Sequence, residues 1–264
     1  MGPACVDRRK RPHPHLGAVV VSRIADVSAE AVLLAGGARA ILLQLANPGV
    51  AAGVARHSDF AGRPLDRLRG TLTYLYVIVY GTPGEAAQVA RHVGETHRLV
   101  RGDNYDARDV DLQLWVAATI YETAMHVRGL VLGGAAEPQL LADYEIVGGA
   151  LGVPAGAWPE SLEAFDRYWK VSSDALTVGE DARSVARELL HPKSGPWWLR
   201  AAMPTVRVFT AGLLTAELRE AYELDFDERA FERQVRFLRA VYPRLPQWVR
   251  HSPMRRYLRR FRAG

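Results

Sequence analysis

Apolar residues recur at the three- and four-residue spacing of amphipathic helices from Ser28 onward, and only residues 18–24 alternate in the manner of a strand. The spacing predicts helices over 28–46, 64–80, 82–101, 111–130, 137–151, 161–176, 181–190, 203–218 and 227–241. We therefore predict an all-α fold. A loosely ordered arm is expected over 1–15, a single globular helical domain over 16–246, and a basic helix or tail over 247–264.

The helix predicted over 82–101 has the clearest start in the chain. Thr82 is a good N-cap, Pro83 takes the first helical position, and Glu85 completes a capping box. The apolar stripe of this helix then runs through Ala86, Val89, Ala90, Val93, His97 and Val100. Among the eight histidines, His97 alone continues such a stripe. A buried imidazole either hydrogen-bonds a neighbouring group or ligates a metal or haem iron, and the spacing leaves both open.

Two further helices carry polar residues one turn apart. Arg67 and Thr71 share a face of the helix over 64–80 and can act on one object. Trp115 and Thr119 do the same beside small residues of the helix over 111–130, a surface suited to a flat macrocycle or to core packing. Plainer roles are an ion pair with Asp66 or Glu85 for Arg67, and a bond to its own helix for Thr71.

Two adjacent glycines interrupt the first long helix. Gly36 and Gly37 lie in the middle of the segment 28–46, where each costs about 1 kcal/mol relative to alanine. Such a cost indicates that something approaches the backbone closely. Another helix is the favoured neighbour, and a flat ligand is the alternative.

Composition narrows the classes of protein. Hydrophobic residues make up 48% and charged residues 24%, which is typical of a globular domain. The net charge of +5 comes from arginines spread along the chain and clustered only at its end, so we predict no nucleic-acid partner. A solvated basic tail is favoured over peripheral contact with a membrane surface. The apolar run over 31–46 is shorter than the roughly 20 residues of a membrane span, and we expect a cytoplasmic protein.

Several chemistries are excluded by the motifs that the chain lacks. One cysteine, Cys5, allows no intrachain disulfide, cysteine-based zinc site or iron–sulfur cluster. Zinc-protease, nucleophile-elbow, P-loop and dinucleotide-binding motifs are also missing. The consecutive residues His57, Ser58 and Asp59 point in different directions and form a polar corner rather than a triad.

A family resemblance favours one of the two roles that helical spacing leaves open for His97. The stretches concerned are Gly36-Gly37-Ala38-Arg39-Ala40, Leu43 to Val50 (LQLANPGV), His57-Ser58-Asp59-Phe60, Gly81-Thr82-Pro83-Gly84-Glu85 and Tyr105-Asp106-Ala107-Arg108-Asp109. Together they resemble the MpaB-type oxygenase family, also described as the rubber-oxygenase catalytic domain, which includes latex-clearing proteins. The likeness runs from about Val27 to Leu176 and continues more loosely towards the C-terminus.

The resemblance implies a globin-like arrangement of helices around a b-type haem, with one histidine as the proximal iron ligand. The family pattern of an Arg and a Thr on one helix, followed by the ligand histidine on the next, falls on Arg67, Thr71 and His97. Arg67 would pair with a haem propionate or orient dioxygen, and Thr71 would hydrogen-bond the same group. Trp115 and Thr119 are expected to contact the macrocycle.

The function implied is that of a haem b-dependent oxygenase or oxidase that uses dioxygen or a peroxide on a small apolar or isoprenoid-like substrate. The alternatives are a haem-binding or sensor protein of the same fold and, more distantly, an enzyme with a histidine-based non-haem site. Latex-clearing proteins carry a lysine, proposed as a distal haem ligand, where this chain has Gly70. Many relatives have a histidine where this chain has Ala117, so no role of a second histidine is carried over. With these departures, rubber cleavage is not transferred to this chain.

Overall fold

The computed structural model describes residues 23–57, 64–193 and 196–264, and of residues 23 and 64–68 it describes the backbone alone. The arm predicted over 1–15 lies outside these ranges. The described chain is helical apart from one hairpin of two-residue strands, which confirms the predicted all-α class. The elements are α1 (Arg23–Ser28), η1 (Ala31–Gly36), α2 (Gly37–Leu45), α3 (Pro48–His57), α4 (Pro64–Tyr80), α5 (Pro83–Leu99), β1 (Arg101–Gly102), β2 (Tyr105–Asp106), α6 (Val110–Leu132), α7 (Pro138–Asp143), α8 (Glu145–Leu151), α9 (Leu162–Asp174), α10 (Glu180–Leu190), α11 (Trp197–Leu213), α12 (Ala216–Ala221), α13 (Glu228–Val241), η2 (Tyr242–Arg244), α14 (Gln247–Arg250) and α15 (Ser252–Arg262).

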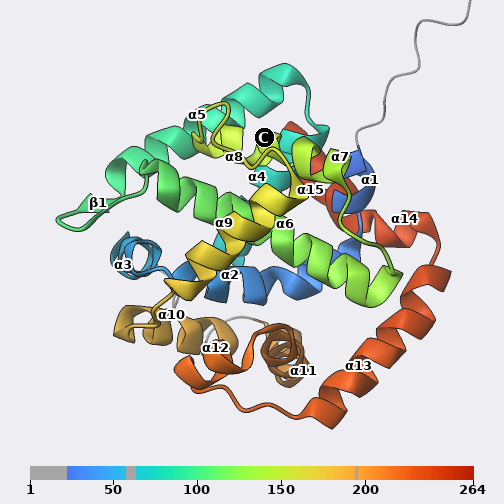
Figure 1. The fold of residues 1–264 in the computed structure, drawn as a ribbon. Helices are drawn as coiled ribbons and strands as arrows, with labels where there is room; N and C mark the ends of the chain where they lie inside the picture. The colour runs from blue at the N-terminus through green and yellow to red at the C-terminus, as the bar shows by residue number, and fades with distance from the viewer. Residues whose placement is uncertain (1–22, 58–63, 194–195) are drawn as a thin grey trace, which may run out of the picture.

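The long helix α6 forms the centre of the fold. It begins at the N-cap Asp109, whose carboxylate accepts hydrogen bonds from the backbone of Asp111 and Leu112. Apolar side chains surround it on most sides because it packs against η1, α2, α8 and α13. Figure 1 shows α9 crossing in front of α6, with α2 and α3 below it and α10 to α13 forming the lowest layer of the view.

The first long helix of the sequence pattern is broken at its glycines. Residues 31–36 form the 3₁₀ helix η1, and α2 begins at Gly37. A Cβ on Gly36 would lie only 2.6 Å from Cγ2 of Thr123 and 2.9 Å from Cγ2 of Val127, so this glycine lets η1 approach α6. Close helix packing is therefore confirmed at Gly36. A Cβ on Gly37 would meet nothing within 4 Å.

Strands occur where the sequence pattern predicted none. Helix α5 ends at Leu99, and the chain then pairs Arg101 with Asp106 and Gly102 with Tyr105. Gly102, one residue beyond the helix predicted over 82–101, lies beneath the ring of Tyr105, whose Cε1 would be 2.6 Å from an added Cβ. The predicted strand over 18–24 was wrong for its last two residues, which belong to α1, and its other residues lie outside the described ranges.

Two other predicted helices are divided. The segment 137–151 forms α7 and α8, and Gly152 ends the pair with a φ of 117° that an L-residue with a side chain rarely adopts. The helix predicted over 203–218 starts earlier, at Trp197, and accommodates Pro204 in its interior before ending at Leu213. Thr215 then caps the short helix α12.

The C-terminal segment is part of the packed structure. Helix α15 packs against α4 and the main hydrophobic core through its apolar face, formed by Met254, Tyr257, Leu258 and Phe261. Arg262 donates two hydrogen bonds to the carboxylate of Glu85, at 2.8 and 3.0 Å. In the elements before α15, Tyr242 of η2 donates a hydrogen bond to the buried Glu30, and Arg250 of α14 forms an ion pair with the same carboxylate at 3.0 Å. The predicted basic tail is thus a helix with one buried face.

No single helix within the described ranges is long and apolar enough to cross a membrane. Only the bent pair Ala31–Leu45 and Pro48–His57, whose two parts meet at 107°, reaches the required length and hydropathy when taken together.

Candidate functional site

A cavity of about 390 Å³ lies between α2, α3, α4, α5, α6 and the hairpin. This volume falls within the range of small-molecule and cofactor sites. The aliphatic part of its lining includes Val50, Val54, Val93, Val100, Leu112, Val116, Ile120 and Leu151. Polar side chains stand among these aliphatic ones, so the cavity is suited to a ligand with a large apolar surface and a few polar atoms.

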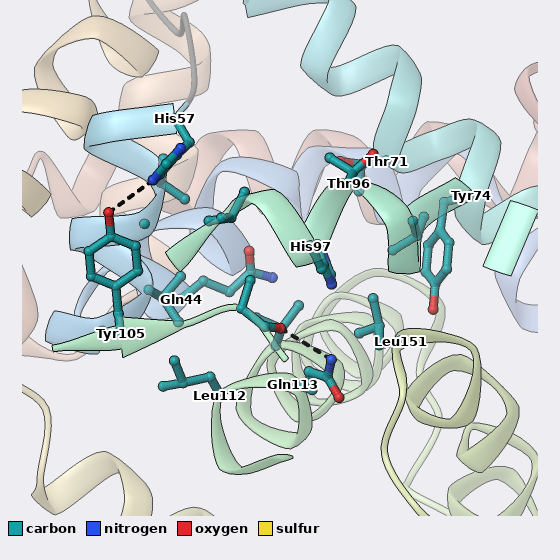
Figure 2. Close-up of a pocket in the computed structure, with 18 of the residues that line it drawn as sticks. Gln44, His57, Thr71, Tyr74, Thr96, His97, Tyr105, Leu112, Gln113 and Leu151 are labelled. Atoms are coloured by element: carbon teal, nitrogen blue, oxygen red, sulfur yellow. Dashed lines mark hydrogen bonds between the residues drawn. The ribbon is translucent and has the colours of Figure 1, made fainter. Parts of the chain in front are cut away.

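His97 reaches this cavity from α5. The apolar stripe of the sequence divides along the helix: Val89 packs into the core, while Val93, His97 and Val100 line the cavity. Figure 2 shows the imidazole of His97 directed into the space between α5 and the glutamines of α2 and α6. Its Nδ1 atom is fully buried. The half-buried ring thus lines the cavity with its Nδ1 atom shielded from solvent.

The helix before α5 supplies the next predicted residues. Thr71 and Gly70 line the same cavity from α4, and a Cβ on Gly70 would meet nothing within 4 Å. Arg67 lies one turn before Thr71 in α4, and its side chain is outside the described residues. The structure thus brings Thr71 and His97 to one chamber.

Gln44 is a site residue that the sequence pattern did not reveal. Its Nε2 donates to Oγ1 of Thr119 at 3.0 Å, and the Thr119 hydroxyl donates to the carbonyl of Val116 at 2.7 Å. Because the hydroxyl proton of Thr119 is used on Val116, its oxygen accepts from Gln44, and this fixes which way the amide faces. Thr119 itself is fully buried and does not line the cavity, so it acts on the site through Gln44.

Trp115 lies outside the cavity. Its indole is buried, stacks on Trp169 with ring centroids 5.2 Å apart, and donates from Nε1 to the carbonyl of Leu43 at 3.1 Å. Trp115 therefore has the core-packing role, one of the two that its position in the sequence suggested, and does not line the cavity. Since Leu43 precedes Gln44, the indole also anchors the turn of α2 that carries the glutamine.

Three more polar residues that line the cavity were not indicated by the sequence pattern. Nε2 of His57 lies 2.9 Å from the hydroxyl of Tyr105, and both residues line the cavity (Figure 2). Gln113 donates to the carbonyl of Ala107 at 3.1 Å. His57 therefore belongs to the site instead of the polar corner predicted for it, and Ser58 and Asp59 lie outside the described residues. Local spacing does not indicate these residues, because the helix break at Asn47-Pro48 and the hairpin direct them into the cavity.

Tyr74 closes the cavity near α8. Its hydroxyl donates to the carbonyl of Val147 at 2.5 Å, and burial raises the pKa of this phenol well above its usual range. The group is therefore a neutral hydrogen-bond donor whose proton is already committed. It shapes the wall and has no acid–base role at ordinary pH.

A second cavity of about 340 Å³ adjoins the first. The two share Gln44, Thr71 and Ile120 in their linings. None of the described residues around the second cavity is charged, and most are aliphatic side chains of η1, α2, α4, α10 and α11. Gly37 lies on its wall and leaves the backbone of α2 bare. An amide and a hydroxyl thus mark the boundary between two apolar spaces.

A buried ion pair supports α2 from behind. Arg39 pairs with Glu122 of α6, donates to Oγ1 of Thr123 at 2.7 Å, and donates from Nε to the carbonyl of Leu213 at 2.8 Å. Burial acts to raise the pKa of Glu122, but hydrogen bonds from His126 and the charge of Arg39 hold it below its ordinary value. The carboxylate therefore stays charged and ties α2, α6 and α11 together.

Comparisons with known proteins give this architecture a family. Residues 25–240 match the family described as ER-bound oxygenase mpaB/B'/Rubber oxygenase, catalytic domain. An uncharacterized protein of Mycobacterium bovis is 33% identical over 241 residues, which is 84% of this chain and 94% of that protein. One from Mycobacterium tuberculosis has the same identity and coverage. No solved structure matches the chain.

Proposed function

This chain belongs to the mpaB and rubber-oxygenase catalytic domain family, and on that premise we propose that it is a haem b-dependent oxygenase or oxidase acting on a small apolar or isoprenoid-like substrate. The observation that carries the proposal is the placing of His97 in an apolar chamber beside a second, uncharged one. The family supports an oxygenase and hence an enzyme, while the haem, the ligand and the substrate class are our inference.

The residues present fit a haem. Haem iron brings four nitrogen ligands in the macrocycle and needs one from the protein, and His97 is suitably placed. The described side chains form no group of three or more His, Cys, Asp or Glu that could hold a bare metal ion, so a non-haem centre has less support among them. When bound, the haem supplies the activation of dioxygen or of a peroxide.

The chain itself would position and isolate the reacting groups. His97 would hold the iron, and the surrounding valines and leucines would keep water away from it. Thr71 and Gln44 would orient polar atoms at the boundary of the two cavities, with Thr119 fixing the amide of Gln44. We assign Arg67 to a haem propionate or to dioxygen, as the family pattern implies, and Trp115 to the support of α2.

The second cavity favours an apolar substrate. Because its walls carry no charge among the described residues, a polar or ionic substrate entering it would lose hydration without compensation. An apolar chain would instead gain roughly 25 cal/mol for each Å² removed from water. We propose that such a substrate lies there with one end at Gln44 and Thr71. We further propose a cytoplasmic protein with no nucleic-acid partner.

The visible spectrum of protein purified after growth with a haem precursor tests the proposal. We expect a Soret band that is lost in His97→Ala and kept in His92→Ala, a matched change at an exposed position of the same helix. A colourless wild type, or a band that survives His97→Ala, overturns the assignment. Oxygen uptake with apolar substrates then separates an enzyme from a sensor, which would show ligand-linked spectral shifts without turnover.

A further inference from the structure

The second cavity reaches exposed and half-buried residues of η1, α10 and α11 and of the segment after α10. Leu34 of η1, Pro192 after α10 and Leu199 of α11 line it, and Leu34 is 36% exposed to solvent. We call these three residues the mouth. Behind them, the buried Met203 and the half-buried Val206 continue the lining along the same face of α11. An apolar passage thus runs from the surface to the boundary marked by Gln44 and Thr71.

Two tryptophans stand exposed beside the mouth. Trp197 and Trp198 begin α11, in the same helical turn as Leu199, and are 75% and 54% exposed. Neither lines the cavity, so packing against its interior does not explain them. Adjacent exposed indoles are costly in water, and their combination of apolar ring and polar N–H suits the interface between a bilayer and water.

The segment around the mouth is rich in basic residues. Residues 189–216, which lie between Glu188 and Glu217, contain Lys193, Arg200 and Arg207 and no aspartate or glutamate. Lys193 and Arg200 are exposed, one on each side of the tryptophans, while Arg207 is half-buried and donates to the carbonyl of Leu190. Long basic side chains beside apolar rings are complementary to anionic lipid headgroups, each cation strengthening membrane affinity about fivefold.

We propose that this surface docks on an anionic bilayer and that the apolar substrate enters the second cavity directly from the lipid. The tryptophans insert at the level of the headgroups, Lys193 and Arg200 contact anionic lipids, and the mouth opens onto the hydrocarbon. The substrate then leaves one apolar phase for another without crossing water. The passage of substrate rests on the proposed function, whereas docking depends only on the surface.

Co-sedimentation of the full chain with phosphatidylcholine vesicles, with and without phosphatidylserine, tests the docking. We expect binding that requires phosphatidylserine and weakens as salt rises. The double change Trp197→Ser and Trp198→Ser should lower affinity about tenfold or more through lost apolar contact. Lys193→Ser with Arg200→Ser should lower it by a similar factor through lost charge.

Trp248→Ser is the matched control, because Trp248 is 68% exposed and lies on α14 near the basic C-terminal helix, away from α11 in the sequence. It should leave vesicle binding unchanged. Far-UV circular dichroism checks that each variant is folded. A wild type that ignores phosphatidylserine overturns the proposal, and so does a Trp248→Ser variant that loses as much affinity as the tryptophan pair. A colourless protein that still docks as expected refutes the haem and leaves the docking intact.

Discussion

Gly36 and Gly37 are chemically identical neighbours, yet alanine at each should change stability in opposite directions. At Gly36 the new methyl group would lie 2.6 Å from Cγ2 of Thr123 and 2.9 Å from Cγ2 of Val127, well inside the ~3.5–4.0 Å at which carbon atoms attract. Both partners are buried on α6, where little room exists to yield. At Gly37 the same methyl group meets nothing within 4 Å.

The magnitudes follow from these distances. Overpacking of this kind costs about 1–3 kcal/mol, and the higher helix propensity of alanine returns at most about 1 kcal/mol, so Gly36→Ala should lose about 1–2 kcal/mol of unfolding free energy. Gly37 has φ −57° and ψ −41°, which alanine adopts without strain. Gly37→Ala should therefore gain about 0.4–1 kcal/mol, mainly by restricting the unfolded chain.

Urea unfolding followed by far-UV circular dichroism measures both changes. We expect the two midpoints to fall on opposite sides of the wild type with an unchanged slope, and the two free energies of unfolding to differ by about 2 kcal/mol. A Gly36→Ala variant as stable as the wild type would show that η1 does not approach α6 as closely as described. A loss of more than about 1 kcal/mol in Gly37→Ala would show that the second cavity is filled at this point.

Three further predictions concern the site and the pH dependence. In haem-loaded protein with carbon monoxide as a probe, Thr119→Val should shift the C–O stretching band while Thr119→Ser should not, because only valine releases the Gln44 amide. Equal spectra in both variants would show that Gln44 does not contact the ligand bound to the haem. Burial raises the pKa of eight of the ten tyrosines, to about 12 for Tyr121, Tyr144 and Tyr168. The neutral phenols therefore stabilise the fold fully below pH ~10, and this stabilisation is lost as the pH rises through the pKa values of the folded protein. Absorbance of tyrosinate should accordingly rise for these residues only when alkali unfolds the chain, and gradual ionisation in the folded state contradicts their burial. Hydrogen bonds from Arg262 and the Thr82 backbone lower the pKa of Glu85 to about 2. The charged carboxylate therefore stabilises the fold above pH ~4.5, and this stabilisation disappears as the pH falls towards 2. The thermal midpoints of Glu85→Gln and wild type should converge over that window, and a constant difference would mean that the charge of Glu85 contributes nothing.

Local pattern was sufficient for the features that depend on neighbours in sequence. The capping box at Thr82 and Glu85 forms as predicted, and the stripe containing His97 turns towards the interior. Gly36 was placed correctly against another helix, but periodicity could not tell it from Gly37, because the two differ only in what α6 places beside them.

The remaining site residues depend on tertiary placement. Gln44 is a polar residue on a largely apolar helix, and its place in the site depends on Thr119, which lies 75 residues away in sequence. The hairpin has strands of two residues, too short for any period, yet it carries Tyr105 to His57. Trp115 was linked to a macrocycle through its spacing from Thr119, whereas α9 covers it with Trp169. Such partners come from distant segments that helical spacing does not encode.

The link between α15 and the start of α5 also sets the order in which the protein can be completed during synthesis. The hydrogen bonds of Glu85 to Arg262 can form only after 177 further residues have been made, and the contacts of Glu30 need Arg250 and His251. Helix α4, which carries Thr71, therefore lacks its cover by α15 until α15 itself has been made. A nascent chain exposes the apolar face of α4 that contacts α15 throughout that time, which makes folding depend on a contact of high sequence separation and leaves the intermediate open to aggregation.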